Sequence, residues 1–285
     1  MKPVAHCLKL AVLAAAFAVS AHAQTPGGIQ ADPCSGVLPI PQSLIDSARA
    51  RFAAPGSPAP AAVPAADLAA YRAMETQQRA NDWPNLCRFR ADNAALVQKP
   101  ASERRVVFMG DSITQNWLLS DPAYFTAGIV NRGISGQTTP QMLGRFRADV
   151  IALKPKVVHI LAGVNDIAGN TGPTTLENIE NNIASMVEIA RANGVGVVLS
   201  SALPADSFGW MPGAKPASDI QAYNAWLKAY AAQEKIVYAD YHTPMATPEG
   251  ALKPAYTFDG VHPNNAGYAV MAPIAQAALK KAGLK

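Results

Sequence analysis

The chain is short of charge and of cysteine. Only 15% of its 285 residues are charged and the formal net charge is +4, with no basic stripe, so the sequence does not indicate nucleic-acid binding. Cysteine occurs only at Cys7, Cys34 and Cys87, without the paired spacing of a zinc site. A Walker-type lysine motif is also absent, which argues against phosphoryl transfer. Hydrophobic residues make up 49% of the chain, enough for a packed core.

Beyond the N-terminus, no uninterrupted apolar run reaches the length of about 18 residues that a membrane-spanning helix needs. Residues 1–23 have the composition of an export signal. Lys2 and Lys9 supply positive charge, an apolar run follows from residue 10 to 19, and Ala21-His22-Ala23 suits cleavage. An uncleaved anchor is the alternative. We expect an exported protein, periplasmic or extracellular, with no integral membrane anchor after cleavage.

Cleavage of the signal would leave two cysteines, Cys34 and Cys87. An even number of cysteines in an exported chain favours one disulfide between them. Such a bond would join the N-terminal extension to the segment that precedes the main domain. Two separate buried thiols are the alternative.

Residues 24–102 form an extension rich in alanine and proline with helical segments. The Pro-rich stretch 53–66 is typical of a linker or of an arm that becomes ordered on contact. A helix is predicted from Asp67, a plausible N-cap, to Gln78. A second helix is predicted within residues 82–96, as a lid or brace for the domain at residues 103–285.

Short apolar runs alternate with helical stretches from residue 105 onward. The predicted strands are Val106–Met109, Ala127–Asn131, Val157–Leu161, Gly196–Ser200 and Ile236–Ala239. The predicted helices are Ser112–Leu119, Pro140–Leu153, Leu176–Asn193, Ile220–Ala232 and Ala266–Lys281. This pattern predicts an α/β domain whose five-stranded parallel sheet is covered on both faces. Ligands bind such sheets beyond the carboxyl ends of the strands.

The first predicted strand ends in Gly110-Asp111-Ser112. Glycine permits a sharp turn, and the following helix N-terminus offers free N–H groups and a favourable dipole to negative charge. Ser112 is therefore a candidate nucleophile with half an oxyanion hole. An ordinary helix cap after a strand is the alternative.

Two further stretches follow the second and third strands. Asn131 to Gly136 contains two glycines, and the N–H of Gly133 could donate to a developing oxyanion; a plain turn is the alternative. Asn165, in Gly163-Val164-Asn165-Asp166, carries an uncharged amide donor suited to the same task. We expect Asp166 to cap local backbone N–H groups.

Asp259 precedes His262 by three residues near the C-terminus, an offset that lets the carboxylate reach Nδ1 in a turn. The other ring nitrogen could then take a proton from Ser112. Outside the signal there are two more histidines. His159 lies in the third strand and is expected in the core, and His242 is the rival base.

In this order, the four stretches resemble the sequence blocks of the SGNH-hydrolase superfamily, also called GDSL lipases and esterases. The resemblance covers roughly residues 103–284 and implies a flavodoxin-like three-layer α/β/α fold. It also implies acyl-ester hydrolysis without metal or cofactor. By this resemblance Ser112 is the nucleophile, His262 the general base and acid, and Asp259 its orienting partner. The backbone amides of Ser112 and Gly133, with the Asn165 side chain, would form the oxyanion hole.

The pattern Gly-x-Ser-x-Gly of the ordinary α/β-hydrolases is absent around Ser112. The loop after the fourth strand contains Phe208 and Trp210, which could line an acyl or sugar subsite or merely anchor the loop. We expect a serine esterase for small-molecule or glycan esters with short acyl groups. Thioesterase or lysophospholipase activity is the alternative within the superfamily, and non-catalytic carbohydrate binding is another.

Overall fold

The computed structural model describes residues 29, 32–37, 39–53, 61–126 and 128–284. The chain divides into two units between Ser35 and Gly36, and the larger one is Gly36–Lys285. The expected signal peptide lies outside the described residues. Within the described part of the chain, no helix is both long enough and apolar enough to cross a membrane.

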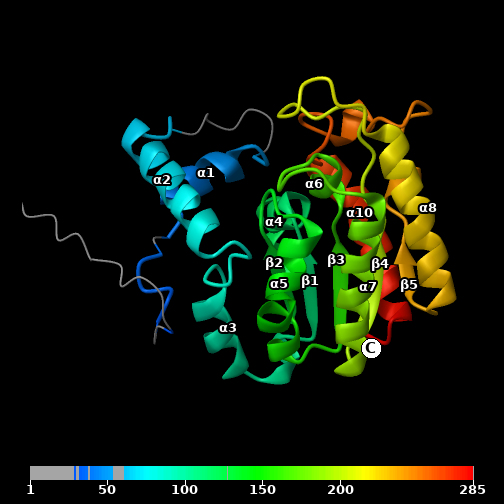
Figure 1. Cartoon of the computed structure of the whole chain (residues 1–285), viewed down its shortest axis with the longest axis horizontal. Helices are drawn as coiled ribbons and strands as arrows, with labels where there is room; N and C mark the ends of the chain where they lie inside the picture. Colours follow the sequence, from blue (N-terminus) through cyan, green and yellow to red (C-terminus); the bar gives the residue numbers. More distant parts are fainter. Residues whose placement is uncertain (1–28, 30–31, 38, 54–60, 127, 285) are drawn as a thin grey trace, which may run out of the picture. The chain divides into compact units, whose positions relative to one another are not determined.

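A five-stranded parallel sheet forms the centre of the larger unit, in the order β2-β1-β3-β4-β5 (Figure 1). The strands are β1 (Val106–Gly110), β2 (Ile129–Gly133), β3 (Val157–Leu161), β4 (Gly196–Ser200) and β5 (Val237–Ala239). Every residue of β1 and β3 is buried, as their continuous apolar sequences predict for central strands. The five strands confirm the predicted sheet.

Strand β2 begins two residues later than the sequence predicts. Gly128 has a φ of +87°, so the chain turns there before the strand starts. The carbonyl of Gly128 accepts the N–H of Val106 at 2.9 Å, and the ladder then pairs Val106 with Ile129. The turn therefore sets the register of β2 against β1.

Helices cover both faces of the sheet. Right-handed crossovers put the helix after β1 on one face and the helices after β2, β3 and β4 on the other, because the sheet grows in opposite directions from β1. The first layer contains α4 (Ser112–Ser120) and α10 (Asn265–Lys281), which contact each other. The second contains α5 (Thr139–Asp149), α7 (Leu176–Ala192) and α8 (Ala217–Gln233), packed in sequence (Figure 1). The three-layer α/β/α architecture is confirmed.

Short helical turns complete the domain. They are η1 (Ala101–Glu103), η2 (Pro122–Phe125), η3 (Ile151–Leu153), α6 (Val164–Ile167), α9 (His242–Met245) and η4 (Pro254–Tyr256). The predicted helix to Leu153 ends at Asp149, and η3 follows it. Three of the four stretches singled out in the sequence lie at α6 and at the ends of β1 and β2, and the fourth, Asp259 to His262, lies between η4 and α10.

The extension contains α1 (Gln42–Ala50), α2 (Ala65–Asn81) and α3 (Arg90–Val97). The sequence did not predict α1. Helix α2 begins after Pro64, so Asp67 is not its N-cap. Instead, Asp67 lies in the first turn and its carboxylate accepts a hydrogen bond from Ser43 Oγ at 2.7 Å, which links α2 to α1.

The helix predicted within residues 82–96 is much shorter, because Asp82 folds the chain into turns. Its carboxylate oxygens accept the backbone N–H groups of Leu86 and Cys87, both at 2.8 Å. These bonds compete with helical pairing, and α3 begins only at Arg90. Cys34 and Cys87 are both disulfide-bonded.

Candidate active site

Ser112 lies at the carboxyl edge of the sheet, where β1 ends and α4 begins. The turn requires glycine at position 110. A Cβ there would lie 2.1 Å from Thr114 Oγ1 and 2.9 Å from the carbonyl oxygen of Leu161. The backbone N–H of Ser112 has no partner among the described residues, so it remains available at the helix N-terminus.

Asp111 is the N-cap of α4 and is fully buried. Its Oδ1 accepts the N–H of Ile113 at 2.9 Å, and its Oδ2 accepts a longer hydrogen bond of 3.4 Å from Asn165 Nδ2. Burial raises the pKa of Asp111 to about 6, against the lowering effect of the Ile113 hydrogen bond. The carboxyl group thus positions the helix start and contacts a second candidate residue.

Ser112 Oγ lies 2.9 Å from Nε2 of His262, and Nδ1 of His262 lies 2.8 Å from Oδ2 of Asp259. The other oxygen of Asp259 accepts the backbone N–H groups of Val261 and His262 at 3.0 and 2.8 Å. Partial burial of Asp259 opposes its ionisation, but these hydrogen bonds hold its pKa well below the usual range. The structure therefore places the three side chains in one hydrogen-bonded row.

The loop that carries His262 is held by its own hydrogen bonds. Thr257 Oγ1 donates to the carbonyl of His262 at 2.8 Å and accepts the N–H of Gly260 at 2.9 Å. Asn264 then caps α10 by accepting the N–H of Gly267 at 3.0 Å. These local hydrogen bonds fix the conformation of the loop that carries the imidazole.

Asn165 lies in α6, directly after β3. The turn at Gly163 has a φ of +105°, and a Cβ there would lie 2.4 Å from the ring of Tyr223. Asn165 is buried, and its Nδ2 donates to the carbonyl of Gln137 at 3.0 Å as well as to Asp111. The Asn165 carboxamide therefore lies beside Asp111, the residue that precedes Ser112.

The carboxylate of Asp166 caps a distant helix rather than the local turn that the sequence suggested. It accepts the N–H of Thr139 at 3.0 and 2.9 Å and the Thr139 hydroxyl at 2.5 Å. Burial raises the pKa of Asp166 to about 6, and the Thr139 hydrogen bonds oppose this shift. Asp166 thus joins α6 to the start of α5.

The position of Gly133 does not suit the oxyanion role expected from the sequence. Its N–H already donates to Asn131 Oδ1 at 2.9 Å, and Asn131 Nδ2 donates in turn to the carbonyl of Thr114 at 2.6 Å. A Cβ on Gly133 would lie 2.2 Å from the backbone nitrogen of Gln115. Gly133 is therefore a close-packing position between β2 and α4, and Asn131 supports that contact.

The second glycine of the same stretch, Gly136, suits the role better. Its φ is +77°, and its backbone N–H has no partner among the described residues. Its neighbour Gln137 accepts a hydrogen bond from Asn165, so Gly136 lies next to that carboxamide. The spacing of the two glycines alone could not distinguish them.

We expect Gly133→Ala to be the more destabilising of two alanine substitutions. The new Cβ would collide with backbone atoms, which costs about 3 kcal/mol of unfolding free energy. At Gly136 the nearest atom to a new Cβ is 3.8 Å away, so Gly136→Ala should cost only the positive-φ penalty of about 1–2 kcal/mol. Urea unfolding of both variants measures the difference, and a larger loss at Gly136 would contradict this assignment.

Trp210 and Phe208 differ in exposure. Trp210 is 44% exposed, and the centre of its ring lies 6.2 Å from that of the His262 imidazole. Phe208 is only 2% exposed and stacks against Trp210 at 5.0 Å. Burial therefore corrects the expectation that Phe208 lines a subsite: it supports Trp210, and Trp210 faces the site.

The two other histidines have different surroundings. His159 is fully buried in β3, stacks on Phe108 and contacts the Tyr241 hydroxyl at 2.8 Å. Burial lowers its pKa to about 3, so it is neutral in the core. His242 begins α9, and its N–H donates to Ser201 Oγ at 2.9 Å. The hydrogen-bond partner of Ser112 Oγ is His262, not His242.

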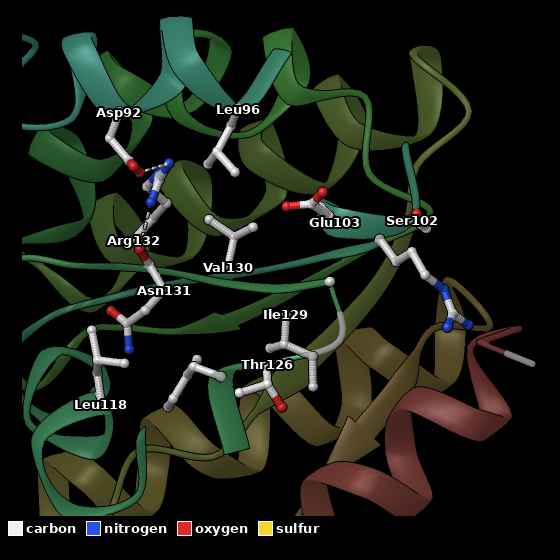
Figure 2. A pocket seen from close by; sticks show the side chains of 13 residues that line it. Asp92, Leu96, Ser102, Glu103, Leu118, Thr126, Ile129, Val130, Asn131 and Arg132 are labelled. Carbon is white, nitrogen blue, oxygen red and sulfur yellow. Dashed lines mark hydrogen bonds and ion pairs between the residues drawn. The ribbon is translucent and has the colours of Figure 1, made fainter. Parts of the chain in front are cut away.

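A pocket of about 630 Å³ lies beside the edge strand β2 (Figure 2). Ser112, His262 and Asp259 are not among its lining residues. Its apolar side chains include Leu96 and Val130, and the ion pair of Arg132 with Asp92, at 2.6 Å, lies at its border.

The described part of the chain contains no group of three or more His, Cys, Asp or Glu that could hold a metal ion.

Known proteins resemble this chain in sequence and in fold. The GDSL-like Lipase/Acylhydrolase family matches residues 108–270, more than half of the 285 residues. Esterase TesA of Pseudomonas aeruginosa is 29% identical over 182 residues, 59% of this chain and 84% of that protein. An acetylxylan esterase of Geobacillus stearothermophilus is 26% identical over 152 residues, 50% of this chain and 68% of that protein. The crystal structure of a GDSL-like lipase from Bacteroides thetaiotaomicron is 46% identical, with a TM-score of 0.68, and the match covers 70% of this chain and 100% of that one.

The family match begins within β1, ends within α10 and includes all of β2, β3, β4 and β5. It also includes the row of Ser112, His262 and Asp259 together with Asn165. The chain therefore belongs to the GDSL-like lipase/acylhydrolase family of SGNH hydrolases.

Proposed function

We propose that the protein is a serine ester hydrolase in which Ser112 attacks the ester. The observation that carries this proposal is the row of Ser112, His262 and Asp259, joined by contacts of 2.9 and 2.8 Å. A hydroxyl is a weak nucleophile until an adjacent base accepts its proton, and the imidazole needs a fixed tautomer for that task. The three side chains supply these roles in order.

In the proposed reaction, Ser112 Oγ bonds to the ester carbonyl carbon while its proton passes to Nε2 of His262. The imidazolium is stabilised by Asp259 and then gives this proton to the leaving alkoxide as the carbon–oxygen bond breaks. Water, deprotonated by His262, attacks the acyl-serine. The carboxylic acid leaves and Ser112 regains its proton.

The oxyanion of each tetrahedral intermediate needs preorganised donors. We assign this role to the backbone N–H groups of Ser112 and Gly136 and to Asn165 Nδ2. Of the two hydrogen bonds that Asn165 Nδ2 donates, the one to Asp111 is the longer, at 3.4 Å against 3.0 Å to Gln137. That N–H is therefore the one more easily redirected to the oxyanion.

We propose short acyl groups, including acetyl groups on carbohydrate, as the substrate class. The exposed face of Trp210 beside His262 suits a sugar ring, because aromatic faces bind such rings by apolar contact. A relative named acetylxylan esterase supports this preference. Export, proposed from residues 1–23, agrees with the disulfide-bonded state of Cys34 and Cys87.

A fluorophosphonate tests the nucleophile directly. Ser112 Oγ should bond to phosphorus as fluoride leaves, and peptide mass spectrometry should find the adduct on Ser112 but not on Ser120 of the same helix. His262→Ala should abolish rapid labelling, whereas His242→Ala should leave it unchanged. Labelling elsewhere, or equal labelling of the His262 variant, would contradict the proposed mechanism.

Esters of para-nitrophenol with increasing acyl length test the substrate class. We expect kcat/KM to be highest for acetate or butyrate and to fall for long chains. Acetylated xylo-oligosaccharides should release acetate. If kcat/KM were highest for long acyl chains, lysophospholipase activity would replace the short-chain assignment. If the protein preferred thioesters to esters, thioesterase activity would replace it.

A further inference from the structure

The carboxamide of Asn170 lies outside the proposed catalytic row but contacts two of its neighbours. Its Nδ2 donates to Asn165 Oδ1 at 2.9 Å and to the carbonyl of Gly136 at 3.1 Å. Its Oδ1 accepts the indole N–H of Trp210 at 3.1 Å. Asn170 therefore connects two assigned oxyanion donors to the exposed ring beside His262.

These contacts determine which way two carboxamides face. A backbone carbonyl only accepts and an indole N–H only donates, so Asn170 must turn its Nδ2 to Gly136 and its Oδ1 to Trp210. The same Nδ2 requires an acceptor from Asn165, which must present Oδ1 to it. The Nδ2 of Asn165 is thereby turned to the opposite side, toward Gln137 and Asp111.

We propose that Asn170 is a positioning residue for ester hydrolysis. It holds the carboxamide of Asn165 with Oδ1 turned to Asn170 and Nδ2 turned toward Gln137 and Asp111, where the N–H on the Asp111 side is the one assigned to the oxyanion. This inference rests on the proposed function, because it assigns Asn170 to the oxyanion hole of that reaction. An Asn165 free to rotate would present an oxygen to the oxyanion for part of the time, and the developing charge would be repelled.

The backbone near Asn170 is anchored independently of its side chain. Its own N–H donates to the carbonyl of Asn165 at 3.0 Å. The next residue, Thr171, places its hydroxyl 3.1 Å from the hydroxyl of Thr138. Removal of the Asn170 carboxamide should therefore leave the segment in place. Thr171→Ala removes a link between the same two segments without touching Asn165, which makes it a matched control.

The kinetic test compares Asn170→Ala and Thr171→Ala with the wild type on para-nitrophenyl acetate. Loss of an oxyanion donor costs about 10²–10³ in kcat, so loss of its support should lower kcat by about 10–100-fold with little change in KM. Thr171→Ala should stay within about twofold of the wild type. Unchanged kcat in Asn170→Ala, or an equal loss in Thr171→Ala, would overturn the proposal.

A double-mutant cycle then tests whether Asn170 acts through Asn165. In the Asn165→Ala background, Asn170→Ala should lower kcat by less than about threefold, because the group that it positions is already absent. A full additional loss of 10–100-fold would show that Asn170 acts by another route, and the proposal would fail.

Nuclear magnetic resonance provides a test that does not depend on catalysis. The side-chain NH₂ signals of Asn165, assigned by their absence from Asn165→Ala, should exchange slowly in the wild type and much faster in Asn170→Ala. Equal exchange in both proteins would overturn the positioning role. A wild type without esterase activity would overturn the proposed function alone, and this measurement would then decide the role of Asn170.

Discussion

Replacement of Ser112 by alanine should lower kcat by about 10⁴-fold or more on para-nitrophenyl acetate, because the acyl-enzyme can no longer form. In the proposed reaction, the Ser112 hydroxyl gives its proton to Nε2 of His262, 2.9 Å away, and its oxygen bonds to the ester carbonyl carbon. The N–H groups assigned to the oxyanion hole would remain, and they account for a small residual rate above that in water. Steady-state kinetics with purified protein measures the loss.

Ser120→Ala in the same helix is the matched control. The Ser120 hydroxyl donates to Asn265 Oδ1 at 2.7 Å, so this change also removes one serine hydrogen bond from α4. Its kcat should remain within about twofold of the wild type, and circular dichroism should show both variants folded. Equal activity of Ser112→Ala and wild type would remove Ser112 from the mechanism.

Arg145→Met should lower the unfolding free energy by about 3–5 kcal/mol, the largest stability effect we expect from a single substitution. Arg145 is fully buried and forms an ion pair with the fully buried Asp149 at 2.9 Å. It also donates to the carbonyls of Gly110 and Arg132 at 3.1 and 2.8 Å, at the ends of β1 and β2. Burial lowers the pKa of Arg145 to about 10, so the guanidinium still carries its charge at neutral pH.

Methionine would leave the Asp149 carboxylate and two strand-end carbonyls without this donor. Arg191→Met is the matched control: Arg191 pairs with Glu234 at 2.7 Å, but half of its side chain is exposed. That substitution should cost less than about 1 kcal/mol. Urea unfolding measures both values, and a loss at Arg145 no greater than that at Arg191 would contradict the role assigned to the buried pair.

Local sequence was sufficient to predict the strands, the layers and three candidate side chains. The strands are recognisable because each is a short apolar run, and parallel strands bring their carboxyl ends to one edge. Asp259 and His262 are three residues apart, so their contact is made within one turn. Ser112 directly follows a strand end. These features depend on residues that are close together in the sequence, so the sequence alone is enough to recognise them.

Helix limits in the extension depended on competing hydrogen bonds that a pattern of residue types does not show. Asp82 could begin a helix or fold a turn, and its two N–H partners favour the turn. Asp67 could cap α2 or bind another helix, and Ser43 provides that second partner. In both cases the hydrogen-bond partners of one carboxylate decide where the helix begins or what the residue contacts.

Only the tertiary structure decided which groups remain free to act. Gly133 and Gly136 look alike in the sequence, but the N–H of Gly133 is occupied by Asn131, whereas that of Gly136 has no partner among the described residues. Phe208 and Trp210 are both aromatic, and packing buries the first and exposes the second. The contact of Asn170 with Trp210 spans 40 residues of sequence. Such contacts arise from long-range packing, because burial and hydrogen-bond competition are settled only when distant segments meet.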